Sequence, residues 1–292
     1  MAMKRASYTT YLLIVLLFPI AAAAQNFHFA TRLGMSVYHG DLKQNSVTVS
    51  QPGLMGSIGA HYDLSENLTA RSYLSYGTMR ADDKKGSATM QERNLNFKSR
   101  VIDFELGAQY SLFSLNERWW TPYVFAGIGF YHFKPFTKDI SGTKTFLKPL
   151  STEGQGFVQG VKDYKLTQIA IPLGIGAQYA LNEDMRIGVE FGYRKLFTDY
   201  LDDVSSVYVD QATLQNARGQ QAVELAWRGD EISATPYPTA GSPRGNAGSN
   251  DGYYFFAITF TSRYFFDKYK EIAGIPMGSR KQKKVGCPST RY

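Results

Sequence analysis

The chain has 292 residues and a single cysteine, Cys287, so an internal disulfide is excluded. Tyrosine (20), phenylalanine (19) and glycine (27) are abundant, yet beyond the N-terminal segment no stretch of about 18 apolar residues is available for a membrane-spanning helix. The formal net charge of +7 resides in the first 24 residues and in residues 267–292, and the neutral segment between them argues against a nucleic-acid-binding surface.

The N-terminal segment is typical of a signal peptide. Lys4 and Arg5 precede an apolar run from Tyr11 to Ile20, and the four alanines at 21–24 are the small residues that signal peptidase requires. We therefore predict a signal peptide at residues 1–24 and export of the remainder. An exported chain that is rich in aromatic residues and glycine, without an apolar helix, is typical of an outer-membrane β-barrel.

Eight segments show the alternation of apolar residues with polar or small residues that is typical of membrane strands. They are residues 27–38, 53–63, 67–80, 99–113, 121–134, 165–181, 184–197 and 253–266. The alternation is clearest in 184–197, where Val189 and Phe191 share one face and Glu190 lies on the other. Residues 121–134 are apolar on both faces, so their orientation stays open.

The connections between these segments alternate in length. Those near 63–67, 114–119 and 181–184 are short, and those at 39–52, 81–97, 135–164 and 198–252 are long. Outer-membrane barrels have short periplasmic turns and long external loops. We predict an all-β, antiparallel, up-and-down transmembrane barrel of about eight strands over residues 25–266, with both termini in the periplasm. The alternative is a barrel of ten strands, which requires part of 198–252 to pair with the sheet. Within the same connection, residues 210–226 favour a short helix.

Charged residues occupy inward-facing positions of the predicted strands. They are Arg32, Arg71, Asp103, Glu105, Arg186, Glu190, Arg194 and Arg263. The interior of an eight-stranded barrel is just wide enough for side chains, and buried charges must be paired. We therefore predict a salt-bridged lumen charge network that plugs the barrel.

Three acids, Asp199, Asp202 and Asp203, follow the seventh predicted strand. One interpretation is a cation site, because Ca²⁺ prefers several carboxylate oxygens, although this spacing matches no EF-hand loop. The other is a polar turn where the strand leaves the bilayer, with Phe197 and Tyr200 at the interface and the acids in water. We favour the turn, and expect neither a metal nor another cofactor.

Two histidines leave open an enzymatic alternative. His39 and His132 are expected at the outer rim, and with Asp199 they would form a site in which one group acts as a general base. The other interpretation is that these histidines lie at headgroup level beside Tyr38 and Tyr131. We predict a non-enzymatic protein without a small-molecule substrate.

Residues 267–292 form a basic tail. Its cluster consists of Arg280, Lys281, Lys283 and Lys284. We interpret this tail either as a solvated, disordered end or as a periplasmic segment that docks an acidic partner. Cys287 in an oxidising periplasm is able to pair with another chain.

Four motifs together suggest a family. They are Tyr38-His-Gly-Asp-Leu42, Thr152-Glu-Gly-Gln-Gly156, the segment 164–176 (YKLTQIAIPLGIG) and Phe197-Thr-Asp-Tyr-Leu-Asp-Asp-Val-Ser205. In this order they resemble the PorG-type outer-membrane barrels of Bacteroidetes, over about residues 27–266. The resemblance implies a component of the type IX secretion machinery that contacts a periplasmic ring, made of a lipoprotein and its partner, and that is not itself the conduit. It implies no catalytic residues.

Two hypotheses follow for the function. The first is a non-enzymatic barrel that sits in outer-membrane lipid and anchors or organises a secretion complex through its periplasmic side. The second is an OmpA-like structural or adhesive barrel that acts through its external loops.

Overall fold

The computed structural model describes residues 27–43, 51–263 and 272. The predicted signal peptide (1–24) and the basic tail, apart from Ile272, lie outside the described residues. The tail residues concerned are Arg280, Lys281, Lys283, Lys284 and Cys287. What the sequence suggests for these segments therefore stays a prediction.

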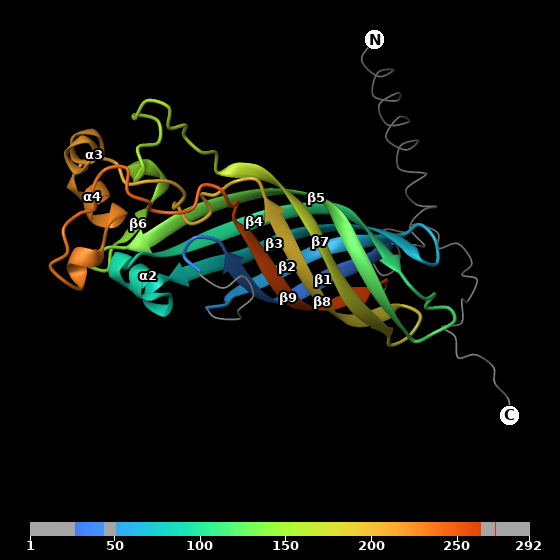
Figure 1. The fold of residues 1–292 in the computed structure, drawn as a ribbon. Coiled ribbons are helices and arrows are strands. Elements are labelled where there is room, and N and C mark those ends of the chain that lie inside the picture. Colours follow the sequence, from blue (N-terminus) through green and yellow to red (C-terminus); the bar gives the residue numbers. More distant parts are fainter. Residues whose placement is uncertain (1–26, 44–50, 264–271, 273–292) are drawn as a thin grey trace, which may run out of the picture.

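Eight long strands form a closed antiparallel barrel (Figure 1). They are β1 (Phe27–His39), β2 (Gly53–Asp63), β3 (Leu68–Asp82), β4 (Asn96–Ser111), β5 (Trp120–Lys138), β7 (Thr167–Ala180), β8 (Met185–Leu196) and β9 (Gly252–Ser262). Each strand pairs with its neighbours in the sequence of strands, and β9 also pairs with β1, which closes the sheet. The predicted eight-stranded, up-and-down barrel is confirmed, and the ten-stranded alternative is excluded.

Alternation along the strands separates a lumen face from an outer face. On β4, Ile102 and Phe104 are 50% and 43% exposed, whereas the intervening Asp103 and the following Glu105 are nearly inaccessible. The structure also settles β5, whose orientation the sequence leaves open. There the side chains of Phe125 and its alternate neighbours point into the barrel, because the burial pattern along β5 alternates in the same way.

The long connections gather at one end of the barrel and form a folded unit, here called the loop cap (residues 40–43, 83–95, 139–166 and 197–251; Figure 1). It contains η2 (Asp83–Lys85), α2 (Ala88–Arg93), β6 (Lys144–Phe146), η3 (Lys148–Leu150), α3 (Gln211–Arg218), α4 (Gln220–Ala226) and η4 (Gly229–Glu231). The strand β6 pairs only with the end of β5. The three short turns lie at the opposite end, here called the short-turn end.

The helix expected within 210–226 forms as two helices. The Asp210 side chain accepts a hydrogen bond from the backbone N–H of Thr213 and so caps the start of α3. Gly219 has a φ of 86°, a left-handed value that glycine adopts without strain, and it separates α3 from α4. In the described part of the chain, no helix is both long enough and apolar enough to cross a membrane.

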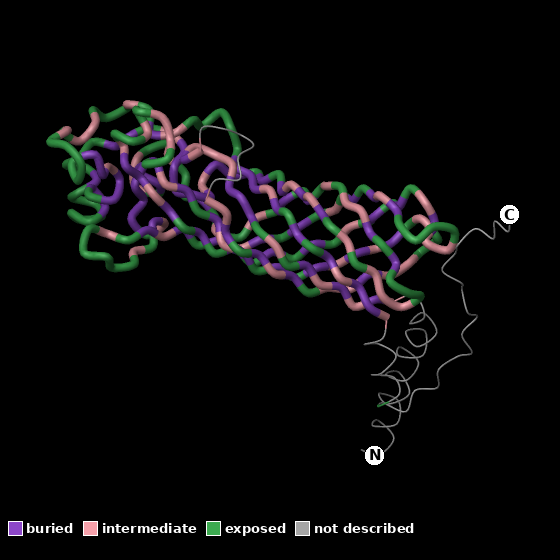
Figure 2. Tube along the Cα trace, turned by 90° about the horizontal axis from the view of Figure 1, so that it is seen from below, coloured by how far each residue is buried: buried purple, intermediate pink, exposed green. Residues whose placement is uncertain are grey.

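The loop cap has its own apolar core (Figure 2). Buried side chains from four connections and from the adjacent strand ends pack together, among them Leu42, Leu95, Leu150, Leu201, Val204, Leu214 and Leu225. Residues 198–252, expected as a long connection with a short helix, are therefore part of a folded unit. A loop cap that buries this much apolar surface is held by the hydrophobic effect, as a small domain is.

Candidate functional site

The centre of the lumen holds three arginines and three acids. They are Arg32 on β1, Arg71 on β3, Asp103 and Glu105 on β4, and Glu190 and Arg194 on β8. Glu105 joins all three cations: its Oε2 accepts hydrogen bonds from Arg32 at 3.0 Å and from Arg194 at 2.6 Å. Its Oε1 lies 3.1 Å from Arg71 Nε. Arg194 Nε also donates to Asp103 Oδ2 at 2.9 Å.

Glu190 completes the neutralisation of these arginines. Its Oε1 accepts hydrogen bonds from Arg32 Nη1 at 2.8 Å and from Arg71 Nη2 at 2.9 Å. Tyr123 Oη donates to Glu190 Oε2 at 3.0 Å. Three cations thus face three anions where water is excluded, and mutual pairing offsets the cost of burying them.

Aromatic rings fill the space around the charged groups. Arg32 Cζ lies 3.6 Å from the ring centroid of Tyr73, and Arg71 Cζ lies 3.9 Å from that of Phe125, which are cation–π contacts. These two rings, Tyr73 and Phe125, are not among the lumen residues predicted from the sequence. Strand parity carries the signal, because Tyr73 shares its face of β3 with Arg71.

Two of the eight inward-facing charges lie apart from this central group, near the short-turn end. Arg186 Nη2 donates a hydrogen bond to Asp63 Oδ2 at 2.9 Å, and His28 Nε2 lies 3.0 Å from the same oxygen. Arg263 Nη2 lies 3.3 Å from His28 Nε2. The lumen is therefore crossed by charged side chains at two levels. Asp63 and His28 are functional candidates that the sequence analysis does not single out.

Asp199, Asp202 and Asp203 are buried beneath the loop cap, with exposed fractions of 7%, 1% and 0%. The expectation that these acids meet water at a rim turn is wrong. The reason is that residues 139–166 fold over the start of 197–251, so the turn lies inside the loop cap.

Asp203 joins these two connections. Its carboxylate accepts hydrogen bonds from Tyr164 Oη at 2.6 Å and from Thr152 Oγ1 at 2.7 Å. Its backbone has a φ of 70°, a left-handed conformation that aspartate tolerates better than most residues. Burial raises the pKa of Asp203 to about 6, against the opposing effect of the Arg244 guanidinium.

Asp202 and Asp251 share one hydroxyl group. Tyr38 Oη lies 2.6 Å from Asp202 Oδ2 and 2.9 Å from Asp251 Oδ1. A single hydroxyl proton serves only one acceptor, so the second contact requires a proton on a carboxyl. Burial raises the pKa of Asp202 to about 8, and burial together with the neighbouring carboxylates raises that of Asp251 well above its ordinary value. This group therefore retains a proton near neutral pH.

Glu153 anchors a second buried network in the loop cap. Its carboxylate accepts hydrogen bonds from Arg244 Nη1 at 2.8 Å, from the Ser205 N–H at 2.8 Å, and from the Ser206 N–H at 2.9 Å. Arg244 also donates to the backbone carbonyl of Asp203 at 2.6 Å. Burial would disfavour the Arg244 cation, but the Glu153 carboxylate holds the pKa of Arg244 above its ordinary value.

Replacing Glu153 with glutamine is expected to loosen the loop cap by about 3 kcal/mol, because the buried Arg244 loses its ion-pair partner. Hydrogen exchange of residues 197–251 measures the change, as faster exchange there with unchanged exchange in the barrel strands. Glu224→Gln, at an exposed position of α4, is the matched control and is expected to leave exchange unchanged. Equal rates of hydrogen exchange in residues 197–251 of the two variants would contradict the assigned role of Glu153.

All four motifs singled out in the sequence meet in these networks. Tyr38 comes from the first motif, Thr152 and Glu153 from the second, Tyr164 from the third, and Asp202 and Asp203 from the fourth. Their residue types are explained by pairing across connections that are distant in sequence. Arg244 and Asp251, which complete the networks, stand in a glycine- and asparagine-rich segment that offers no local signal.

The structure does not bring His39, His132 and Asp199 together at the rim. Among the described residues, no group of His, Cys, Asp and Glu side chains has the arrangement needed to hold a metal ion. His39 packs against the Tyr254 ring on β9, and His132 Nδ1 lies 2.8 Å from Thr167 Oγ1. Because three strands separate β1 from β5 in either direction around the barrel, these histidines lie on opposite walls, and Asp199 is enclosed in the loop cap.

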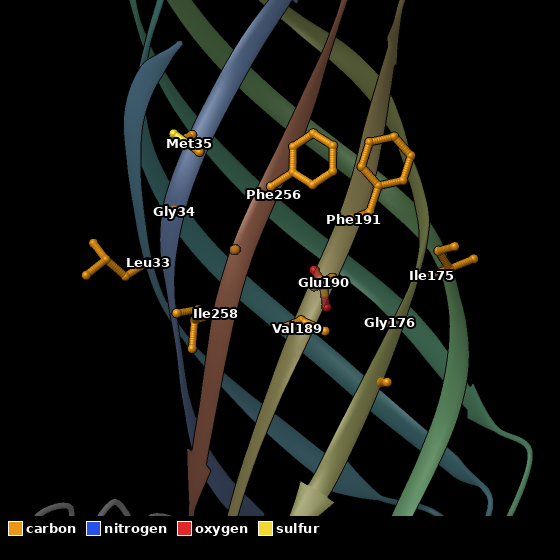
Figure 3. Close-up of a pocket in the computed structure, with 12 residues that line it drawn as sticks. Leu33, Gly34, Met35, Ile175, Gly176, Val189, Glu190, Phe191, Phe256 and Ile258 are labelled. Atoms are coloured by element: carbon orange, nitrogen blue, oxygen red, sulfur yellow. The ribbon is translucent and has the colours of Figure 1, made fainter. Parts of the chain in front are cut away.

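The outer face of the barrel is apolar. Leu33 on β1, Val189 on β8 and Ile258 on β9 are 71%, 61% and 60% exposed, and Figure 3 shows them around a shallow hollow in the wall formed by β1, β9, β8 and β7. Near the short-turn end, Trp120 and Tyr179 are half exposed on the same face, where membrane barrels carry an aromatic girdle.

A closed barrel with an apolar outer face, an aromatic girdle and a charged, filled lumen defines the class of outer-membrane β-barrel proteins. The sequence agrees with this class. The chain belongs to the outer membrane protein beta-barrel domain family, whose model matches residues 10–216. No curated protein matches the chain.

Several solved structures resemble this fold. Neisserial surface protein A is 12% identical, with 82% of this chain and 97% of that chain covered and a TM-score of 0.40. Ail, the attachment invasion locus protein of Yersinia pestis, is 7% identical, with coverages of 81% and 95% and a TM-score of 0.37. The outer-membrane enzyme PagL is 14% identical, with coverages of 80% and 98% and a TM-score of 0.33. Likeness at this level of identity concerns the fold alone.

Proposed function

We propose that this outer-membrane barrel is a non-enzymatic component of a protein secretion machinery of type IX. The loop cap would lie outside the cell, and the short turns and both termini in the periplasm. The observation that carries the proposal is the convergence of all four motifs of the PorG-type resemblance in the hydrogen-bonded networks of the loop cap. Because these residues form hydrogen bonds with one another, their joint presence supports the resemblance to PorG-type barrels more strongly than any single motif does.

The filled lumen supports a role as an anchor and not as the conduit. One group of ion pairs crosses the centre of the lumen and a second crosses it near the short-turn end. A barrel of eight strands therefore has no further room for a polypeptide. The partner would then bind from the periplasm, where the short turns and the basic tail with Arg280, Lys281, Lys283 and Lys284 are available to a ring made of a lipoprotein and its partner.

Purification of the full-length protein from outer membranes in mild detergent is expected to bring a periplasmic lipoprotein and its partner with it, as identified by mass spectrometry. Removal of residues 267–292 is expected to reduce this recovery. The matched control is Lys162→Gln/Lys165→Gln, which lowers the charge in the loop cap without touching the periplasmic side. A barrel that brings no such proteins, in cells whose secretion continues without it, would overturn the proposal.

The orientation is tested separately by labelling whole cells. In a Cys287→Ser background, Arg218→Cys on α3 places an exposed thiol in the loop cap, and Glu183→Cys places one in the turn between β7 and β8. A membrane-impermeant maleimide is expected to label only the first thiol. Labelling of only the second would reverse the proposed orientation.

An OmpA-like structural or adhesive role is the second candidate. The folded loop cap favours it, because an ordered external surface is suited to contact with other surfaces. In that case, exchanging the loop cap for short turns would abolish surface attachment and leave secretion intact, whereas the secretion proposal expects loss of the periplasmic partners to impair secretion.

A further inference from the structure

One side of the barrel carries a band of outward-facing bases next to the loop cap, here called the basic band. It consists of Arg80 on β3, Lys98 and Arg100 on β4, Lys134 and Lys138 on β5, and Lys144 on β6. All six are exposed, and each occupies the outer face of its strand. They lie on four strands that are consecutive in the sheet around this wall.

The strand register places the bases of this band directly opposite one another. Arg80 pairs in register with Lys98, Arg100 with Lys134, and Lys138 with Lys144. Like charges directly opposite across antiparallel strands repel, and each such pair is destabilising. Three such pairs on adjacent strands are therefore unfavourable for the isolated protein.

The acids next to the basic band make their hydrogen bonds with other groups. In the part of the chain that the structure describes, none of the six bases forms an ion pair within 4.0 Å with a carboxylate. Asp82, on the outer face of β3, accepts a hydrogen bond from the Lys84 backbone N–H. Asp139, next to Lys138, accepts from Ser141 and Thr143. The arrangement is thus complementary to an external anion.

The basic band begins where the apolar outer face ends. Arg100 lies two residues, about 7 Å along β4, from Ile102, which is half exposed. Lys144 Nζ lies 4.1 Å from the ring centroid of Phe136 and 4.5 Å from that of Phe146, so aromatic rings are interleaved with the bases. Aromatic and basic residues together at the edge of an apolar belt are typical of the headgroup region of a membrane.

The other wall of the barrel carries fewer bases. The outward positions nearest the loop cap on β7, β8, β9 and β1 are Thr167, Lys195, Tyr254 and His39. Lys195 is the one base among these four, and the exposed Lys165, just before β7, lies next to the basic band, beside Lys134. The charge is therefore concentrated on one side, as in a binding surface, and is not a ring that follows the membrane edge.

We propose that the basic band binds the phosphate groups of phosphorylated glycolipid headgroups in the outer leaflet. Arginine forms paired hydrogen bonds with phosphate oxygens, and the lysines supply additional point charges. Each base near an anionic lipid surface contributes favourably, and the six act on one patch. The assignment to the outer leaflet rests on the proposed orientation with the loop cap outside.

Binding of diphosphorylated lipid A to the full-length protein in neutral detergent micelles tests this proposal. The triple variant Lys98→Gln/Arg100→Gln/Lys134→Gln is expected to weaken binding by about tenfold or more, because three phosphate contacts are lost. Dephosphorylated lipid A is expected to bind the unaltered protein as weakly as it binds the triple variant. Retention of the folded-barrel mobility on gels shows that the variant is folded.

The control Arg118→Gln/Lys195→Gln/Arg218→Gln removes the same charge at exposed positions outside the basic band and is expected to bind like the unaltered protein. The proposal would be overturned if both triple variants lost lipid A binding equally. It would also be overturned if the unaltered protein bound dephosphorylated and diphosphorylated lipid A equally well. Displacement of the lipid by excess inorganic phosphate would reassign the surface to free phosphate and also overturn it. If the first triple variant fails to fold, Lys134→Gln alone is expected to weaken binding measurably, and an unchanged affinity rejects the site.

This assay is independent of the proposed orientation, because a micelle has no inner and outer leaflet. Failure of lipid binding would therefore reject the basic band as a headgroup site and leave the orientation standing. A reversed labelling pattern with intact lipid binding would move the site to the other leaflet.

Discussion

Replacing Glu105 with glutamine is expected to destabilise the barrel by about 3–5 kcal/mol, because three buried arginines lose the carboxylate that they share. Glu105 contacts Arg32, Arg71 and Arg194, and its side chain is fully enclosed. Glutamine preserves the volume but leaves the lumen centre with an excess positive charge. The free energy of unfolding in detergent, measured by urea titration with gel mobility as the readout, should fall accordingly.

The matched control for this variant is Glu117→Gln, at an exposed position in the turn between β4 and β5. It removes the same charge without leaving a buried cation unpaired, and its stability is expected to equal that of the unaltered protein within about 0.5 kcal/mol. An equally stable Glu105→Gln variant would show that the lumen arginines do not depend on this carboxylate.

Raising the pH through about 8 is expected to loosen the loop cap while the barrel stays folded. Burial raises the pKa of Asp202 in the folded state above that of an exposed aspartate, so the folded state binds the proton more tightly than the unfolded state does. The resulting stabilisation is complete at low pH, below the pKa of an exposed aspartate. It is lost as the pH rises through the folded-state value. The nearby Asp41 carboxylate also raises the pKa of Asp202, and the Arg93 guanidinium lowers it.

Limited proteolysis of residues 197–251 at a series of pH values measures this loosening. Asp202→Asn, which carries a neutral side chain at every pH, is expected to reduce the dependence, because its amide group can replace the protonated carboxyl beside Tyr38 and Asp251. Asp199 and Asp251, whose pKa values burial also raises, supply the remainder. Asp230→Asn, at an exposed position of η4, should keep the full dependence. Cleavage that does not change between pH 6 and pH 9 in the unaltered protein would contradict the shared proton.

The strands were accessible to sequence reasoning because their pattern is local. Alternation in 184–197 predicts β8 to within a residue at each end, since the lipid on one face and the lumen on the other select side chains at every second position. The same parity assigns Arg32 and Glu105 to the lumen before any contact is known. Which arginine meets which acid depends on the stagger of the closed barrel, and no single strand contains that information.

The loop cap was not accessible in the same way. Residues 198–252 have the polar and glycine-rich composition of an exposed loop, and their helices α3 and α4 are short. Asp203 is adjacent in sequence to Asp202, yet one pairs with Tyr164 and Thr152 while the other pairs with Tyr38. Tyr164 and Thr152 come from the 139–166 connection and Tyr38 from the end of β1, so the partner of each acid depends on how the connections pack on the strand ends.

The sequence by itself determined the membrane barrel, its eight strands and the charged residues that face the lumen, because alternation is imposed residue by residue by the surroundings of each strand. Only the tertiary structure decided the orientation of β5 and placed the turn containing Asp199, Asp202 and Asp203 inside a folded loop cap. Burial of a polar turn requires donors from elsewhere in the chain, here Tyr164, Thr152 and Tyr38, and such long-range pairing leaves no periodic trace in the sequence.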